Sequence, residues 1–124
     1  MVSTYGYITV ANLEAYESVD YGNIDSTLYS DANIEAKITI AERIVNGLIG
    51  TTYTGTIPDR IVAATTIISA QLMRNVLIRN GHVDPRDPDK QNAGEVAESQ
   101  LLKTLLLPEQ ADNLDLPTWW VIKG

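Results

Sequence analysis

The clearest hydrophobic pattern in the chain lies between residues 31 and 50. Apolar side chains recur there at alternating steps of four and three residues, which places them on one stripe of a helix. They are Ile34, Ile38, Ala41, Val45 and Leu48. The side chains expected on the solvent side are Glu35, Lys37, Glu42, Arg43 and Asn46. Ser30 or Asp31 can cap the start of this helix, and Gly50 stands where a C-cap is expected.

The strongest helix-start signal is Thr56-Ile57-Pro58-Asp59, where a capping hydroxyl is followed by an early proline and an acid. From Ile57 to Asn80 apolar residues surround much of the predicted helix, and Gly81 ends it. A helix that is apolar nearly all round is enclosed by its neighbours. The pattern therefore predicts the central helix of the fold.

Shorter patterns flank these two helices. After a strand-like lead at Tyr5 to Ile8, the segment Thr9 to Tyr16 predicts a short helix that is capped by Thr9 and stops near Val19. Residues 20–26 are rich in turn formers. The helical pattern resumes from Glu95 to Leu107.

Two segments predict no packed element. Residues 82–94 combine prolines and charged side chains without apolar periodicity, which is typical of an exposed loop. The end of the chain, Asp112 to Gly124, is predicted to be extended. The sequence thus predicts a mainly α fold: a small helical bundle over residues 1–110 with a long charged loop, followed by an extended C-terminal tail over residues 111–124.

Length and composition agree with one globular domain. The chain has 124 residues and is 44% hydrophobic, which is enough for a single core. The inward-facing positions of three helices predict that core. It consists of Ile38, Ala41, Val45, Leu48, Ile61, Ile68, Leu72, Leu101 and Leu105.

Both tryptophans of the chain, Trp119 and Trp120, lie in the predicted tail. Each indole can bury roughly 150–250 Å² of largely apolar surface. Such a surface needs a partner, because large apolar groups left in water mark interaction sites. Either the tail folds back onto its own domain, or it docks on another protein chain.

Charge and residue content exclude several kinds of function. The net charge is −7, which argues against binding along a phosphate backbone, because that affinity comes from Lys and Arg. Cysteine is absent, so no disulfide, thiolate nucleophile or Cys-ligated zinc can form. Residues 1–10 lack a signal-peptide pattern, and the run Ile61 to Met73 is too short and too polar to span a bilayer. We therefore expect neither export nor a membrane anchor.

Candidate catalytic and metal-binding residues lie around residues 82–89. His82 with Asp84 could act as a base with an orienting carboxylate, but no Ser or Cys nucleophile motif accompanies them. Asp84, Asp87 and Asp89 could bind a divalent cation, but they lack the ligand spacing of an EF-hand loop. The sequence therefore predicts no catalytic residue, no metal site and no cofactor.

Three phrases carry a family resemblance. They are Ile8-Thr9-Val10-Ala11-Asn12-Leu13-Glu14-Ala15-Tyr16, then Ala41-Glu42-Arg43, then Ile57-Pro58-Asp59-Arg60-Ile61. In this order the phrases resemble the head-tail connector, or adaptor, proteins of tailed phages and related viruses. The resemblance spans about Tyr7 to Leu106. The chain departs from the family's pattern in its long loop over residues 82–94 and in its Trp-rich tail.

The resemblance implies a structural virion protein of the neck, assembled in the host cytoplasm, with no enzymatic activity, cofactor or membrane contact. Its subunits would form a dodecameric ring under the portal, extend the DNA channel and join capsid to tail. The implied partners are the portal protein and a stopper or tail-completion protein, and genomic DNA would pass through without sequence-specific binding. Because family members dock on the portal through their C-terminal segment, the implied partner-binding residues are Leu116, Trp119, Trp120, Val121 and Ile122.

Two other classes of function stay open. A helical nucleic-acid-binding or regulatory module, such as a terminase small subunit, would be favoured by a basic recognition helix, and none is apparent. A small metal-dependent hydrolase built on His82 and the loop acids would require a bound metal ion.

Overall fold

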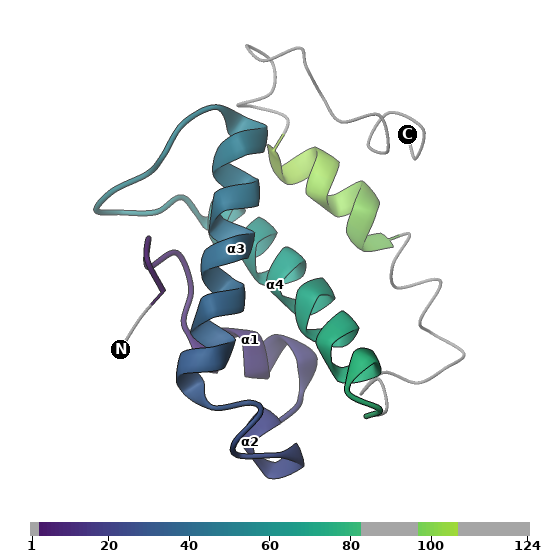
Figure 1. The fold of residues 1–124 in the computed structure, drawn as a ribbon. Helices are drawn as coiled ribbons and strands as arrows, with labels where there is room; N and C mark the ends of the chain where they lie inside the picture. Colours follow the sequence, from purple (N-terminus) through teal and green to yellow (C-terminus); the bar gives the residue numbers. More distant parts are fainter. Residues whose placement is uncertain (1–2, 83–96, 107–124) are drawn as a thin grey trace.

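The structure, a computed structural model, describes residues 3–82 and 97–106. This part of the chain contains helices and no strands. The labelled helices are α1 (Val10–Glu17), α2 (Tyr21–Ile24), α3 (Asp31–Ile49) and α4 (Asp59–Arg79). A further helix, here called helix 97–106, follows in the second described stretch (Figure 1). The predicted mainly α bundle is confirmed.

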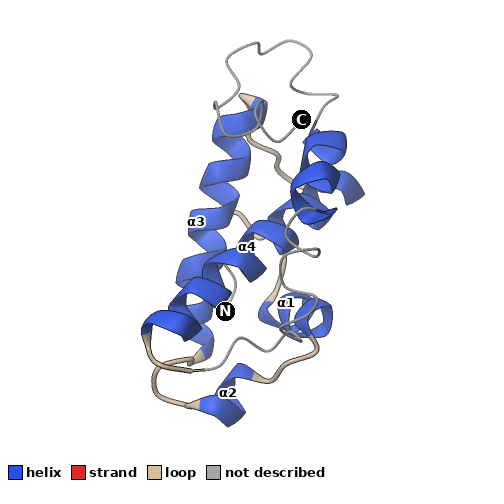
Figure 2. Cartoon of the chain, turned by 90° about the vertical axis from the view of Figure 1, so that its right-hand side faces the viewer, coloured by secondary structure: helices blue, strands red, loops and turns tan. Residues whose placement is uncertain are grey.

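The longest helix, α4, is the centre of the bundle. It packs against α3 and against α1, and Figure 2 shows it between these two helices. Helix 97–106 contacts it through Arg74 and Glu98. The prediction that this apolar helix is enclosed by its neighbours is therefore confirmed, although its C-terminal half keeps an open side.

The core draws on all the helices that surround α4. Six predicted core residues are buried: Ile38, Ala41, Val45, Leu48, Ile61 and Ile68. The stripe on α3 is buried along its whole length, from Ile34 to Leu48. The prediction for Leu72 needs correction, because this side chain is half-buried and lines a surface groove.

Helix 97–106 faces the bundle in a register that differs from the predicted one by one residue. Leu102 is 2% exposed and Leu106 is fully buried, whereas Leu101 is 46% exposed and Leu105 is only partly buried. The inward stripe is Glu98, Leu102 and Leu106, at steps of four residues. Because the first residue of this inward stripe is a glutamate, the spacing of apolar residues alone predicted that the face with Leu101 and Leu105 is buried.

Most of the predicted helix ends are confirmed. The Thr9 hydroxyl accepts a hydrogen bond from the Asn12 backbone amide, and the Asn12 Oδ1 accepts one from the Thr9 backbone amide. Ser30 caps α3 in the same way, by accepting from the Asn33 amide. Gly50 ends α3 with a left-handed φ of 74°, a conformation that is cheap only for glycine.

The start of α4 differs from its prediction. The N-cap is Pro58 rather than Thr56, and no side chain caps the helix. Pro58 has an extended ψ of 145°, so the helical conformation begins one residue later, at Asp59. The Pro58 carbonyl accepts hydrogen bonds from the amides of Ile61 and Val62.

The end of α4 is a Schellman motif. Gly81 has a φ of +81°, the His82 amide donates to the Leu77 carbonyl at 2.8 Å, and the Gly81 amide donates to the Ile78 carbonyl at 3.0 Å. The prediction that Gly81 ends this helix is confirmed. The motif turns the chain so that His82 comes back against the bundle.

Two local predictions are wrong. Tyr5 to Ile8 is not a strand, because the amides of Tyr5 and Tyr7 donate to the Glu42 side chain instead of to a neighbouring strand. Residues 20–26, predicted as a turn, contain the single-turn helix α2. The loop from residue 83 to 94 and the tail over 111–124 lie outside the described residues.

The length and composition of α4 would also allow a membrane span. Its most apolar window has a mean hydropathy of 1.5, and 61% of that window is buried inside the bundle. The sequence prediction considered only the shorter run from Ile61 to Met73. A buried core helix has this same composition, so the helix by itself is weak evidence for a membrane.

Candidate functional site

A groove of about 400 Å³ lies between α3 and the C-terminal half of α4, and is here called the α3/α4 groove. Its lining residues are Lys37, Ile40, Leu72, Asn75, Val76, Ile78 and Arg79. Ile78 is 57% exposed and Ile40 is 40% exposed. Apolar side chains gathered in a concave surface mark a binding site more than scattered ones do. The groove is thus a candidate docking surface.

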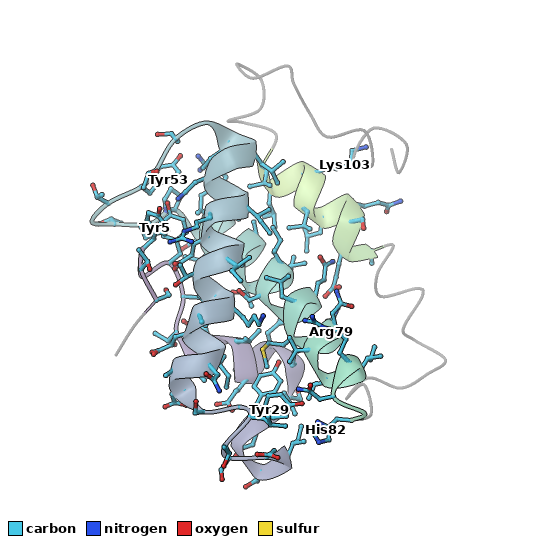
Figure 3. All side chains as sticks on the ribbon, viewed as in Figure 1. Tyr5, Tyr29, Tyr53, Arg79, His82 and Lys103 are labelled. Atoms are coloured by element: carbon cyan, nitrogen blue, oxygen red, sulfur yellow. The ribbon has the colours of Figure 1, made fainter. Side chains whose placement is uncertain are left out.

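The groove continues toward α2. A smaller cleft shares Lys37 and Val76 with it, and reaches Leu28 and Tyr29 in the connection between α2 and α3. Figure 3 places Arg79, Tyr29 and His82 at the same end of the bundle. The apolar surface therefore extends along both helices, from the middle of α3 to the end of α4.

The charge of the groove is opposite to that of the chain as a whole. Among the described residues that line it, Lys37 and Arg79 are the two ionisable ones, and both are positive. The whole chain carries a net charge of −7. An acidic and apolar segment would therefore suit the groove better than a basic one.

The groove is not apparent in the sequence because its lining residues come from two helices. Ile40, which lines the groove, lies off the buried stripe of α3, and Ile44, which is not among the lining residues, follows four residues later on the same exposed side. That spacing was the available signal, since two large aliphatic residues recurring on a solvent face at i and i+4 form a patch. Ile78 was hidden in the nearly continuous apolar sequence of α4.

A buried ionic cluster joins three helices at Arg74. Its Nε donates to Glu17 of α1 at 2.5 Å, while Nη1 and Nη2 donate to the two carboxylate oxygens of Glu98 at 2.7 and 3.0 Å. The Tyr16 hydroxyl donates to Glu98 at 2.5 Å. These four residues hold α1, α4 and helix 97–106 together.

The cluster shifts the pKa values of its members. Burial alone would raise the pKa of Glu98, but hydrogen bonds from Arg74 and Tyr16 and the charge of Arg74 outweigh it and hold this pKa below its ordinary value. Burial and the hydrogen bond to Glu98 raise the pKa of Tyr16. The stable state of the cluster is therefore an ionised Glu98 with a neutral Tyr16.

A second buried carboxylate, Glu42, organises the N-terminal segment. It is fully buried in α3; one oxygen accepts from the Ser3 hydroxyl at 2.5 Å and the Tyr7 amide at 2.8 Å, and the other accepts from the Tyr5 amide at 3.1 Å. The Tyr7 hydroxyl then donates to Asn46 and accepts from the Tyr53 amide. The prediction of Glu42 as a solvent-facing residue is wrong, as it is for the buried Glu35.

Among the described residues, His82 contacts the tyrosine Tyr29. Its Nδ1 lies 2.5 Å from the Tyr29 hydroxyl, the two rings meet edge to face, and the Asn80 side-chain Nδ2 donates to the same hydroxyl. Asp84, Asp87 and Asp89 lie outside the described residues. Within residues 3–82 and 97–106, no group of three or more His, Cys, Asp or Glu side chains could hold a metal ion.

The predicted partner-binding residues are not among those whose structure is described. Leu116, Trp119, Trp120, Val121 and Ile122 all belong to the tail after residue 106. The prediction for them stays a prediction.

Comparison with known proteins adds no relative. No protein-family model matches the chain, and neither a curated protein nor a solved structure matches it.

Proposed function

We propose that this chain is a structural virion protein, a head-tail connector that forms a ring under the portal, extends the DNA channel and joins capsid to tail. The observation that carries the proposal is the distribution of exposed large apolar side chains over separate helices of a small bundle and over the connection between α2 and α3. They are Tyr16, Ile24, Leu28, Ile40, Ile44, Ile78 and Leu101. A protein whose work is assembly needs such surfaces.

A ring makes a particular demand on these surfaces. Each subunit must present two different patches, since a closed ring is built from heterologous, head-to-tail contacts. Ile40 and Ile44 on α3 form one candidate patch, and Tyr16 with Leu101 forms another beside the Arg74 cluster. The bundle thus offers separate surfaces for two neighbours.

The phrases behind the resemblance fall at positions that determine the fold. Thr9 and Asn12 form the capping box of α1, and Glu42 holds the N-terminal segment against α3. The third phrase spans the start of α4. The first two phrases therefore act in helix capping and in holding the N-terminal segment.

The proposed partners are the portal protein, bound through Leu116, Trp119, Trp120, Val121 and Ile122, and a stopper or tail-completion protein. Buried aromatic anchors typically supply much of the energy of an interface. The proposed ring is dodecameric and sits in the virion neck, after assembly in the host cytoplasm. Its acidity suits a DNA channel, because negative charge repels phosphate and lets DNA slide.

The alternative is a helical nucleic-acid-binding module such as a terminase small subunit. It would need a basic surface, yet the basic side chains of the described residues are few and one of them, Arg74, is buried between two carboxylates. A DNA-binding titration at low salt separates the two functions, since phosphate contacts are strongest there. Tight binding that weakens steeply with added salt would favour the alternative.

The direct test is binding of the purified chain to a portal protein, which is to be sought among the genes that neighbour this chain's own. We expect the purified chain to add to isolated portal rings as a second ring in cryo-electron microscopy class averages. Ile44→Asp on the exposed side of α3 should weaken ring formation, whereas Thr54→Asp in an exposed loop serves as control. A chain that stays monomeric with and without portal rings would contradict the proposal.

A further inference from the structure

We propose that the α3/α4 groove is the receptor for the chain's own C-terminal segment, residues 114–122, and that this segment occupies the groove in the unassembled subunit. The inference goes beyond the proposed function, because it concerns the free chain and requires no portal. It rests on the shape and charge of the groove and on the composition and reach of the tail.

The groove needs an apolar occupant of substantial size. Ile40, Leu72, Val76 and Ile78 supply its apolar lining, and its volume is about 400 Å³. Pockets of roughly 300–1,000 Å³ bury small apolar ligands well. The segment offers matching groups in Leu114, Leu116, Trp119, Trp120, Val121 and Ile122. An indole presents a large rigid apolar surface at a low cost in conformational entropy.

The charges on the two sides are complementary. Lys37 and Arg79 are the ionisable residues of the described groove lining. The proposed occupant, residues 114–122, carries Asp115 and no basic residue, and Glu109 and Asp112 precede it in the chain. Opposite charges at the rim of an interface select the partner and its orientation more than they add affinity. The apolar groups would then supply the binding energy, and the acidic residues would set the orientation of the segment in the groove.

The segment can reach the groove within one chain. Leu106, the last described residue, is fully buried in the core. The stretch from residue 107 to 118 precedes Trp119, and an extended chain of that length spans about 40 Å at roughly 3.3–3.6 Å per residue. A small domain measures about 30 Å across. An extended stretch of this length is therefore longer than such a domain is wide, and no second copy is required for Trp119 to lie against its own bundle.

The sequence makes this docking measurable, because Trp119 and Trp120 are the only tryptophans. Tryptophan fluorescence of the full chain therefore reports on the segment alone. We expect acrylamide to quench this fluorescence several-fold less in the full chain than in a peptide of residues 107–124. The protection should be independent of protein concentration.

Groove variants test the location. Ile78→Asp and Arg79→Glu should each raise quenching to the level of the peptide, while the circular dichroism of the bundle stays unchanged because both side chains are exposed. Leu101→Asp, at a similarly exposed site on helix 97–106, should leave quenching low.

Three results would overturn the inference. The tryptophans of the full chain could be as accessible as those of the peptide, the groove variants could leave the protection intact, or the protection could grow with concentration and so report a second copy. None of these results bears on portal binding, so failure here is distinguishable from failure of the proposed function.

Discussion

Arg74 and Glu98 form a bidentate ion pair inside the bundle, with both guanidinium Nη atoms bound to the carboxylate at 2.7 and 3.0 Å. The same arginine binds Glu17, so one cation pairs with two buried acids from different helices. The pair attaches helix 97–106 to α4 by polar contacts, in addition to the apolar contacts that Leu102 and Leu106 make with the core. It places helix 97–106 against α4 in a defined register.

The first prediction concerns the arginine of this cluster. Arg74→Met should lower the free energy of unfolding by about 3–5 kcal/mol, because it leaves Glu17 and Glu98 buried without their cation. Chemical denaturation measures this change. Arg43→Met is the matched control on the exposed side of α3 and should change stability by less than about 0.5 kcal/mol. Equal effects of the two variants would show that the cluster contributes little.

The second prediction is a pH dependence of stability. The pKa of Glu98 lies below its ordinary value of 4.5 in the folded chain, so folding favours the ionised carboxylate. Its contribution is present above the unfolded-state pKa and is lost as the pH falls through the lower, folded-state pKa. Denaturant melts across this acidic range should show the free energy of unfolding decreasing as the pH is lowered. The slope should be smaller in Glu98→Gln, and an unchanged slope would contradict this account.

The third prediction concerns the N-terminal segment. Glu42→Leu removes the acceptor of three hydrogen bonds, from Ser3, Tyr5 and Tyr7. Each buried donor left unsatisfied costs about 1–3 kcal/mol, so the segment should detach from α3. Hydrogen exchange should show the amides of Tyr5 and Tyr7 losing protection, while those of α4 change little. Arg43→Leu, at the adjacent exposed position, should leave these amides protected.

The fourth prediction tests the register of helix 97–106. Leu102→Ala should cost about 2–5 kcal/mol by lost transfer energy and a cavity. Leu101→Ala removes the same atoms at a site that is mostly in solvent, and should cost about 0.5 kcal/mol or less. Thermal or denaturant melts of both variants decide the matter. A larger loss of stability in Leu101→Ala than in Leu102→Ala would instead support the register predicted from the sequence.

The long helices were predictable because their residues obey local rules. The four-and-three spacing from Ile34 to Leu48 fixes which side of α3 is buried, and Thr9, Ser30 and Gly50 carry the caps that define helix ends. These signals act within a few residues of one another. They can therefore be recognised in the sequence without knowledge of the tertiary contacts.

The errors arose where a charged residue is buried by a distant partner. Glu42 was assigned to solvent because its three donors lie 35–39 residues earlier in the chain. Glu98 was overlooked because its cation, Arg74, belongs to another helix. The α3/α4 groove was missed for the same reason, since Ile40 and Ile78 meet only in the folded bundle. Pairing between distant residues cannot be derived from the local pattern of either one.

The most direct test of the central claim, that this chain is a connector bound to the portal, is co-sedimentation with portal-bearing capsids. The wild-type chain should sediment with them, whereas a variant with Trp119 and Trp120 replaced by alanine should stay in the supernatant with its helical circular dichroism nearly intact. The reason is that aromatic anchors of an interface typically cost about 2 kcal/mol or more each when truncated. Binding by the double variant as strong as that of the wild type, or no binding by the wild type, would contradict the account.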